Sequence, residues 1–224
     1  MGAARASQRS FDVVQLDGVA ARAFVERDYA ARELAVWDAL LLPAMRSDYL
    51  RLLLLHRHGG VYADATYEFL RPLEELVARS QHGLLPYFYA IVGNNFLFVR
   101  EPRDGFVAAC LALATDLVER RCDASALIAT GPGVLNAVRC VLLPDQRPLI
   151  AAFAGGLADW VAGGWPECLA AADRVVVPSP EAVRDARAFD LIFKDDLDTW
   201  ASSRPSPHRD RDDHWLRWQG GLYR

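Results

Sequence analysis

The segment from residue 47 to residue 64 constrains the fold more than any other part of the chain. Residues 47–58 are apolar on nearly every side, a pattern that predicts a buried helix. Gly59 and Gly60 follow and predict the end of that helix, because glycine adopts the left-handed C-terminal conformation without a steric penalty. Residues 61–64 then have the pattern of a short buried strand that ends in a carboxylate.

Two charged residues interrupt the predicted buried helix. Asp48 and Arg51 are three residues apart, so on a helix they share one face. Left unpaired in a core, each would cost several kcal/mol. They either pair with each other and cap the helix, or they line a ligand-binding cleft. Asp64 favours the cleft, because ligands of open α/β sheets bind beyond the carboxyl ends of the strands.

Oxygen-bearing side chains continue beyond Asp64. Thr66 and Glu68 follow it at a spacing of two, which places all three side chains on one face if the strand continues. Oxygen ligands suit hard divalent cations such as Mg²⁺ or Mn²⁺. The sequence therefore predicts a metal or polar-ligand site after the strand.

A set of seven residues within this segment carries a family resemblance: Ser47, Asp48, Arg51, Gly59, Gly60, Tyr62 and Asp64. Their order resembles the nucleotide-sugar-binding core of the family 32 glycosyltransferases, in which Ser-Asp-x-x-Arg, an apolar helix and Gly-Gly precede an aromatic residue and a DxD pair. One position departs from the pattern, since Thr66 stands where the second acid of the pair is expected.

The resemblance implies a nucleotide-diphospho-sugar transferase (GT-A-like) α/β fold, with a mixed sheet flanked by helices. The first strand–helix unit of relatives has no counterpart here, which predicts a truncated sequence or an altered donor site. The implied activity is retaining transfer of a sugar from a UDP- or GDP-sugar to a glycan, lipid or protein acceptor, with Mn²⁺ or Mg²⁺. Such an enzyme would serve polysaccharide or glycan biosynthesis.

The resemblance also assigns site residues. Asp64 is the expected catalytic residue, and the candidate metal ligands are Asp64, Thr66, Glu68 and His214. The expected donor-binding residues are Asp48, Arg51, Tyr62, Asn94, Asn95, Thr130 and Gly131. For the two asparagines, a role only in a turn is the alternative. The loop around Gly131 precedes a predicted helix, where exposed backbone N–H groups can bind an anion or sugar hydroxyls.

Apolar periodicity predicts further elements along the chain. Helices are expected at 104–118 and 134–142, and a short helix is expected to start at 72–77. Two more helices are expected within residues 19–42, with a break between them near Asp28. Strands are expected at 11–16, at 175–177 and twice within 84–99, the last two joined as a hairpin at 93–95.

Composition limits the class of protein. The 224 residues are 52% hydrophobic and 24% charged, which predicts a single domain over residues 1–224, with a mobile tail from about residue 194. The net charge of −4 argues against nucleic acid as a partner. Without a signal peptide or an apolar run of about 18 residues, a cytoplasmic or membrane-peripheral location is expected.

Two other functions stay open at this point. The first is a non-catalytic or truncated glycosyltransferase-like binding module, favoured by Thr66 and by the missing first unit. The second is a metal-dependent hydrolase. The sequence has no Gly-x-Ser-x-Gly, no second Asp-rich strand end and no histidine cluster to support that hydrolase.

Overall fold

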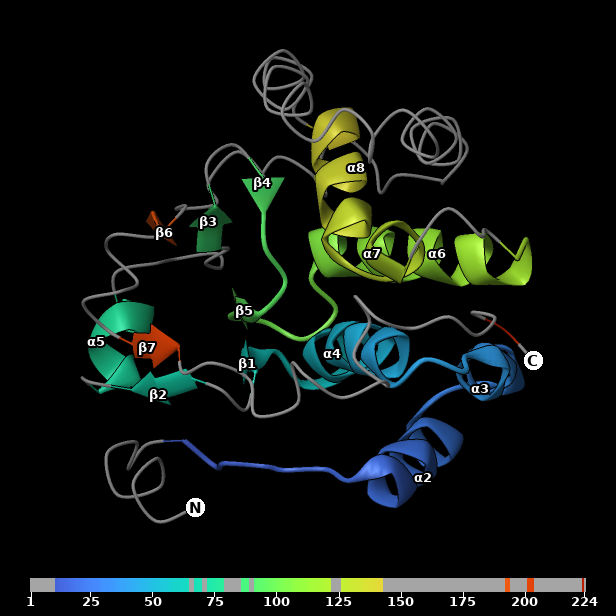
Figure 1. Cartoon of the computed structure of the whole chain (residues 1–224). Helices are drawn as coiled ribbons and strands as arrows, with labels where there is room; N and C mark the ends of the chain where they lie inside the picture. Colours follow the sequence, from blue (N-terminus) through green and yellow to red (C-terminus); the bar gives the residue numbers. More distant parts are fainter. Residues whose placement is uncertain are drawn as a thin grey trace.

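The computed structural model describes residues 11–64, 67–69, 72–78, 86–88, 91–121, 126–142, 192–193, 201–203 and 223. The helices of this part are α2 (Gly18–Asp28), α3 (Ala31–Ala39), α4 (Pro43–His58), α5 (Leu73–Ala78), α6 (Gly105–Glu119), α7 (Ala126–Ala129) and α8 (Pro132–Leu142). The strands are β1 (Gly60–Ala63), β2 (Tyr67–Phe69), β3 (Pro86–Phe88), β4 (Ile91–Val92), β5 (Phe96–Val99), β6 (Ile192–Phe193) and β7 (Ala201–Ser203). Most helices gather on one side, with β1 and β5 beside α4 (Figure 1).

Local signals in the sequence explain the helix boundaries. The carboxylate of Asp17 accepts hydrogen bonds from the first backbone N–H groups of α2. The break predicted near Asp28 is confirmed, since α2 ends there and α3 begins three residues later. Proline occupies the first turn of α4, where its missing N–H costs nothing. The helices predicted at 72–77, 104–118 and 134–142 are confirmed as α5, α6 and α8.

Gly59 ends α4, as predicted. Its φ is 66°, and a Cβ atom at this position would lie 2.9 Å from the carbonyl oxygen of Arg100. Both the backbone conformation and the close approach therefore require glycine. The chain turns here directly from α4 into β1.

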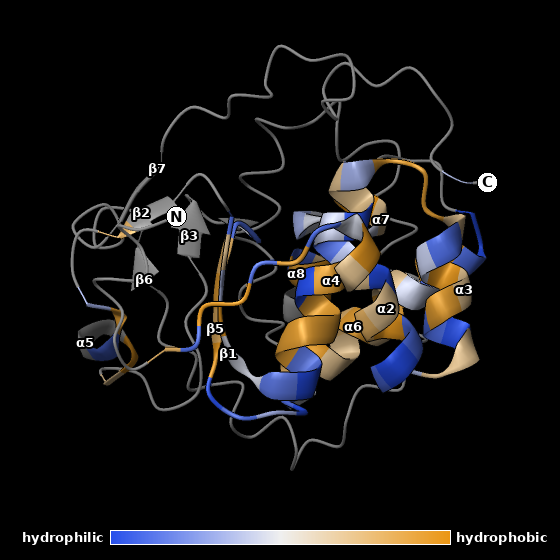
Figure 2. Ribbon diagram, turned by 90° about the horizontal axis from the view of Figure 1, so that it is seen from below, coloured by the Kyte–Doolittle hydropathy of each residue, from blue (hydrophilic) through white to orange (hydrophobic). Residues whose placement is uncertain are grey.

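The main core lies between α4 and the helices around it. Tyr49, Leu52, Leu53 and Leu55 of α4 are buried together with Leu113 of α6. In Figure 2 the ribbon of α6 is largely hydrophobic, whereas α2, α3 and α4 carry both hydrophobic and hydrophilic stretches. The prediction of a buried helix after residue 47 is confirmed.

Strand β5 holds β1 in place by antiparallel pairing, from Gly60 opposite Val99 to Ala63 opposite Phe96. Every residue of β5 is buried. Leu97 and Val99 join the main core, and Phe96 and Phe98 join a smaller second cluster with Leu73. Because alternate side chains of a strand point to opposite faces, β5 is covered on both sides.

The described strands form small, separate sheets. Besides β1–β5, they are an antiparallel β2–β7 pair and a β4–β3–β6 sheet in which β3 and β6 are parallel. The fold is thus a helix-rich mixture of helices and strands, compatible at this level with the predicted α/β class.

Two predicted strand features are wrong. Residues 12–17 have no regular secondary structure, because no described strand lies beside them to pair with, and Val14 is exposed. The predicted hairpin at 93–95 does not form, since β4 pairs with β3 and β5 pairs with β1. Next to β1, all four residues of β5 are buried, with side chains in both hydrophobic clusters, and this burial outweighs the local turn signal.

Some predictions fall on other parts of the chain. Four of them lie outside the described residues: the predicted strand at 175–177, Thr66, the side chain of Glu68 and His214. Strand β1 ends at Ala63 and β2 begins at Tyr67, so they are separate strands with different partners. Within the predicted tail, residues 201–203 form β7, and the division into domain and tail stays a prediction. None of the described helices combines the length and apolar content of a membrane span.

Candidate functional site

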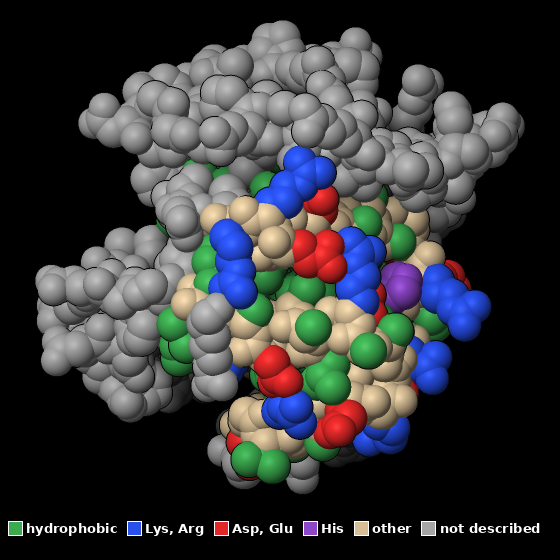
Figure 3. Space-filling view, turned by 90° about the vertical axis from the view of Figure 1, so that its right-hand side faces the viewer, with side chains coloured by type: hydrophobic (Ala, Val, Ile, Leu, Met, Phe, Trp, Pro, Cys, Tyr) green, Lys and Arg blue, Asp and Glu red, His purple; other side chains and the backbone are tan. Residues whose placement is uncertain are grey.

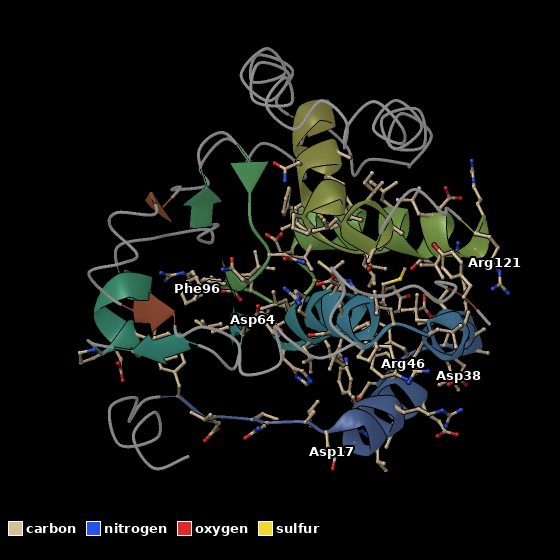
Figure 4. The ribbon with its side chains drawn as sticks, in the orientation of Figure 1. Asp17, Asp38, Arg46, Asp64, Phe96 and Arg121 are labelled. Atoms are coloured by element: carbon tan, nitrogen blue, oxygen red, sulfur yellow. The ribbon has the colours of Figure 1, made fainter. Side chains whose placement is uncertain are left out.

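Arg51 lies between two carboxylates at the junction of α4 and β1. Its Nη2 atom is 2.7 Å from Oδ1 of Asp48 and 3.7 Å from Oδ1 of Asp64. Its side chain is only 5% exposed, whereas that of Asp64 is 37% exposed. Figure 4 shows Asp64 just beyond β1, near the side of α4. The two acids and the arginine are therefore neighbours, although they come from two elements.

The guanidinium group of Arg51 is held from several directions. Nε donates to the backbone carbonyl of Ser47 at 3.3 Å, and Nη1 donates to the carbonyl of Asn94. The guanidinium carbon lies 4.5 Å from the centre of the Tyr62 ring, within cation–π range. These contacts compensate the burial of the charge and tie α4 to β1 and to the turn before β5.

Asp48 is the more buried of the two acids, with 13% of its side chain exposed. Its Oδ1 also accepts a hydrogen bond from Nδ2 of Asn94 at 2.9 Å, and its Oδ2 lies 3.5 Å from the hydroxyl of Thr130. Burial raises the pKa of Asp48 to about 6, while the charge of Arg51 acts in the opposite direction. Both carboxylate oxygens of Asp48 thus already have partners within the chain.

Asp64 follows the last residue of β1, as predicted, and is held differently. Its Oδ1 accepts a hydrogen bond from the phenol of Tyr62 at 2.8 Å, and its backbone N–H donates to the carbonyl of Asn95 at 2.8 Å. Burial raises the pKa of Tyr62 to about 12, so the phenol keeps its proton. Among the described residues, Oδ2 of Asp64 has no hydrogen-bond partner, and 37% of the Asp64 side chain is exposed.

Gly131 packs too closely for any side chain. A Cβ atom there would lie 2.8 Å from the Cα atom of Leu127. The backbone N–H groups of Thr130 and Gly131 both donate to the carbonyl of Ala126. These two N–H groups are therefore already used within the chain, and a contact of Gly131 with a donor stays a prediction.

The structure brings most of the predicted site residues together. One hydrogen-bonded group contains Asp48, Arg51, Tyr62, Asp64, Asn94 and Thr130. Asn95 contributes its backbone carbonyl, whereas Thr66, the side chain of Glu68 and His214 are not placed. Sequence reasoning missed Ser47 as a site residue, although its hydroxyl lies 3.2 Å from the phenol oxygen of Tyr62. Its place beside Asp48 in the Ser-Asp-x-x-Arg motif was the available signal.

One carboxylate of the site is suited to bind a divalent cation. No three His, Cys, Asp or Glu side chains of the described segments form a group that could hold a metal. Mg²⁺, however, is commonly bound through one or two carboxylates together with substrate phosphates. The partly exposed carboxylate of Asp64 fits this pattern as one ligand.

Residues 9–82 match the family model of the glycosyltransferase sugar-binding region containing DXD motif. This segment is glycosyltransferase-like at the family level. It spans about a third of the chain and contains Asp48, Arg51, Tyr62 and Asp64, while Asn94 and Thr130 lie beyond it. Membership of family 32 in particular stays a prediction.

A solved structure, "PaToxG Glycosyltransferase", is similar to this chain with 17% sequence identity and a TM-score of 0.38. The similarity covers 81% of this chain and 54% of that structure, so the chain spans about half of its length. No curated protein matches the sequence.

Proposed function

We propose that the chain is a glycosyltransferase domain that binds a nucleotide-sugar donor and transfers its sugar to an acceptor. The observation that carries this proposal is the arrangement around Arg51, in which a buried ion pair with Asp48 stands beside the accessible carboxylate of Asp64. The match of residues 9–82 to the glycosyltransferase family model supports it.

The proposed site depends on a divalent cation, Mn²⁺ or Mg²⁺. When bound, such an ion stabilises the negative charge that develops on a leaving diphosphate. Asp64 would hold it through the oxygen that has no partner among the described residues, and Thr66, Glu68 and His214 are the further ligands proposed from the sequence. The donor is a UDP- or GDP-sugar, transferred with retention to a glycan, lipid or protein acceptor in the cytoplasm or at a membrane surface.

The buried pair acts differently from Asp64 in this proposal. Asp48 and Arg51 already have hydrogen-bond partners within the chain. A carboxylate can accept about four hydrogen bonds and a guanidinium group can donate five, so a donor would contact either one only at the positions that these partners leave free. Asn94, Asn95, Tyr62, Thr130 and Gly131 stay candidate donor contacts around this pair.

A non-catalytic donor-binding module is the second candidate, because Thr66 replaces the second acid of the DxD pair. Such a module would bind donor without turnover. The distinction requires binding and transfer to be measured on the same protein.

Isothermal titration calorimetry with several UDP- and GDP-sugars, with and without Mn²⁺, tests the proposal. We expect donor binding that requires Mn²⁺ in the wild type and is lost in Asp64→Asn. Release of free nucleotide, measured on the same samples, separates an enzyme from a binding module. If none of the donors binds, with or without Mn²⁺, both the glycosyltransferase and the donor-binding module are excluded.

A further inference from the structure

A chain of hydrogen bonds leads from Arg51 to Asp64 through two hydroxyl groups. Nη2 of Arg51 lies 3.4 Å from Oγ of Ser47. Ser47 Oγ lies 3.2 Å from the phenol oxygen of Tyr62, which in turn lies 2.8 Å from Oδ1 of Asp64. The last contact is the shortest of the three, as expected for a hydrogen bond to a carboxylate.

The chemistry of its two ends gives this chain a single direction. A guanidinium group can only donate hydrogen bonds, and an ionised carboxylate can only accept them. The phenol therefore donates its one proton to Asp64 and accepts the proton of Ser47, whose oxygen accepts from Arg51. In this series of hydrogen bonds, the hydroxyl protons of Ser47 and Tyr62 are therefore both directed toward Asp64.

We propose that Ser47 and Tyr62 are positioning residues that fix the Asp64 carboxylate, with Oδ1 held inward and Oδ2 presented to a divalent cation. The Tyr62 ring is itself held by the guanidinium group at 4.5 Å, so the phenol has a defined place from which to donate. Asp64 needs such support, because a side chain that is 37% exposed is not fixed by packing alone. The part of the inference that concerns the cation rests on the proposed function.

The chain also contains a matched control for the loss of a phenolic hydroxyl. Tyr49 lies on α4, whereas Tyr62 lies on β1, and the phenol oxygen of Tyr49 is 2.9 Å from the hydroxyl of Thr115 in the core. Tyr49→Phe therefore removes the same group from a buried hydrogen bond that does not involve Asp64. Tyr62→Phe, in turn, keeps the aromatic ring that contacts Arg51.

The first experiment needs no metal. In protein labelled with ¹³C at aspartate carboxyl carbons, the Asp64 signal is the one that disappears in Asp64→Asn. We expect this signal to shift in Tyr62→Phe and, by a smaller amount, in Ser47→Ala, and to stay in place in Tyr49→Phe. An unchanged Asp64 signal in Tyr62→Phe overturns the positioning role, provided that circular dichroism shows the variant folded.

The second experiment measures Mn²⁺ binding by electron paramagnetic resonance in the presence of UDP or GDP, because the proposed site completes its metal coordination with substrate phosphates. We expect Tyr62→Phe to weaken Mn²⁺ affinity about 10-fold, the lower end of the range for residues that orient metal ligands. Tyr49→Phe should bind as the wild type does. Equal or tighter binding by Tyr62→Phe overturns the inference. Failure of the wild type to bind Mn²⁺ overturns the metal-dependent function, and the carboxyl signal then still decides whether Tyr62 positions Asp64.

Discussion

Nη2 of Arg51 lies 2.7 Å from Oδ1 of Asp48, and the two residues occupy neighbouring positions on the same face of α4. This ion pair is nearly buried, the side-chain amide of Asn94 donates to its carboxylate, and the hydroxyl of Thr130 lies 3.5 Å from it. A buried pair of this kind contributes little over an apolar pair, but removing one partner leaves an uncompensated charge. The pair therefore matters for stability mainly when one partner is removed, because the other charge is then left buried and unpaired.

Arg51→Met should be strongly destabilising. It leaves Asp48 buried without its counter-charge, and the loss of one partner of a buried pair costs about 3–5 kcal/mol. Urea unfolding measures the change in the free energy of unfolding. Arg32→Met is the control, because it breaks the surface ion pair with Glu119 and should cost about 1 kcal/mol or less. Such mixed surface charges are visible in Figure 3. Equal effects of the two substitutions would contradict the assigned role of Arg51.

The stability of the fold should depend on pH through Asp48. Its pKa in the folded protein is raised from 3.8 to about 6, so folding takes up a proton between roughly pH 4 and pH 6. Through this group alone, the folded state is favoured by acid, and this advantage is lost as the pH rises through 6. The difference is on the order of 3 kcal/mol.

The difference in unfolding free energy between wild type and Asp48→Asn isolates this contribution, because other titrating groups are common to both proteins. We expect the wild type to gain stability relative to the variant as the pH falls from 7.5 to 4.5. A difference that stays constant over this range, or that changes in the opposite sense, would contradict the raised pKa.

Asp64→Asn should abolish sugar transfer while leaving the fold intact. The amide keeps the shape of the carboxylate and an oxygen that can accept from Tyr62, but it removes the negative charge that a cation requires. A loss of roughly a hundredfold or more in rate is expected. Transfer assays measure the rate, and a melting temperature close to that of the wild type confirms the fold. Full activity would exclude Asp64 as the carboxylate that holds the metal ion.

Gly131→Ala should destabilise the connection between α7 and α8. The new Cβ atom would lie 2.8 Å from Cα and 2.9 Å from the carbonyl oxygen of Leu127, and the overpacking is expected to cost about 1–3 kcal/mol. Thr130, which contacts Asp48, would shift with it. Gly18→Ala is the matched control, because a Cβ atom at Gly18 has no neighbour within 4 Å. Thermal unfolding of both variants tests the difference.

The sequence by itself determined the local features of the site. Helical periodicity places Asp48 and Arg51 on one face of α4, and Gly59 ends that helix because glycine adopts a positive φ without a steric penalty. The position of Asp64 directly after a short strand follows from the same segment. These relationships extend over only a few residues, so the spacing of residues along the chain is sufficient to predict them.

Only the tertiary structure decided which distant residues complete the site. Asn94 and Thr130 are 46 and 82 residues from Asp48 along the chain. Asn94 reaches Asp48 because β5 pairs with β1 and not with β4, a choice that buries the side chains of β5 on both faces. The turn signal at 93–95 predicted the other pairing. A local turn preference is small compared with the burial of four apolar residues, and that burial depends on elements from both ends of the described fold.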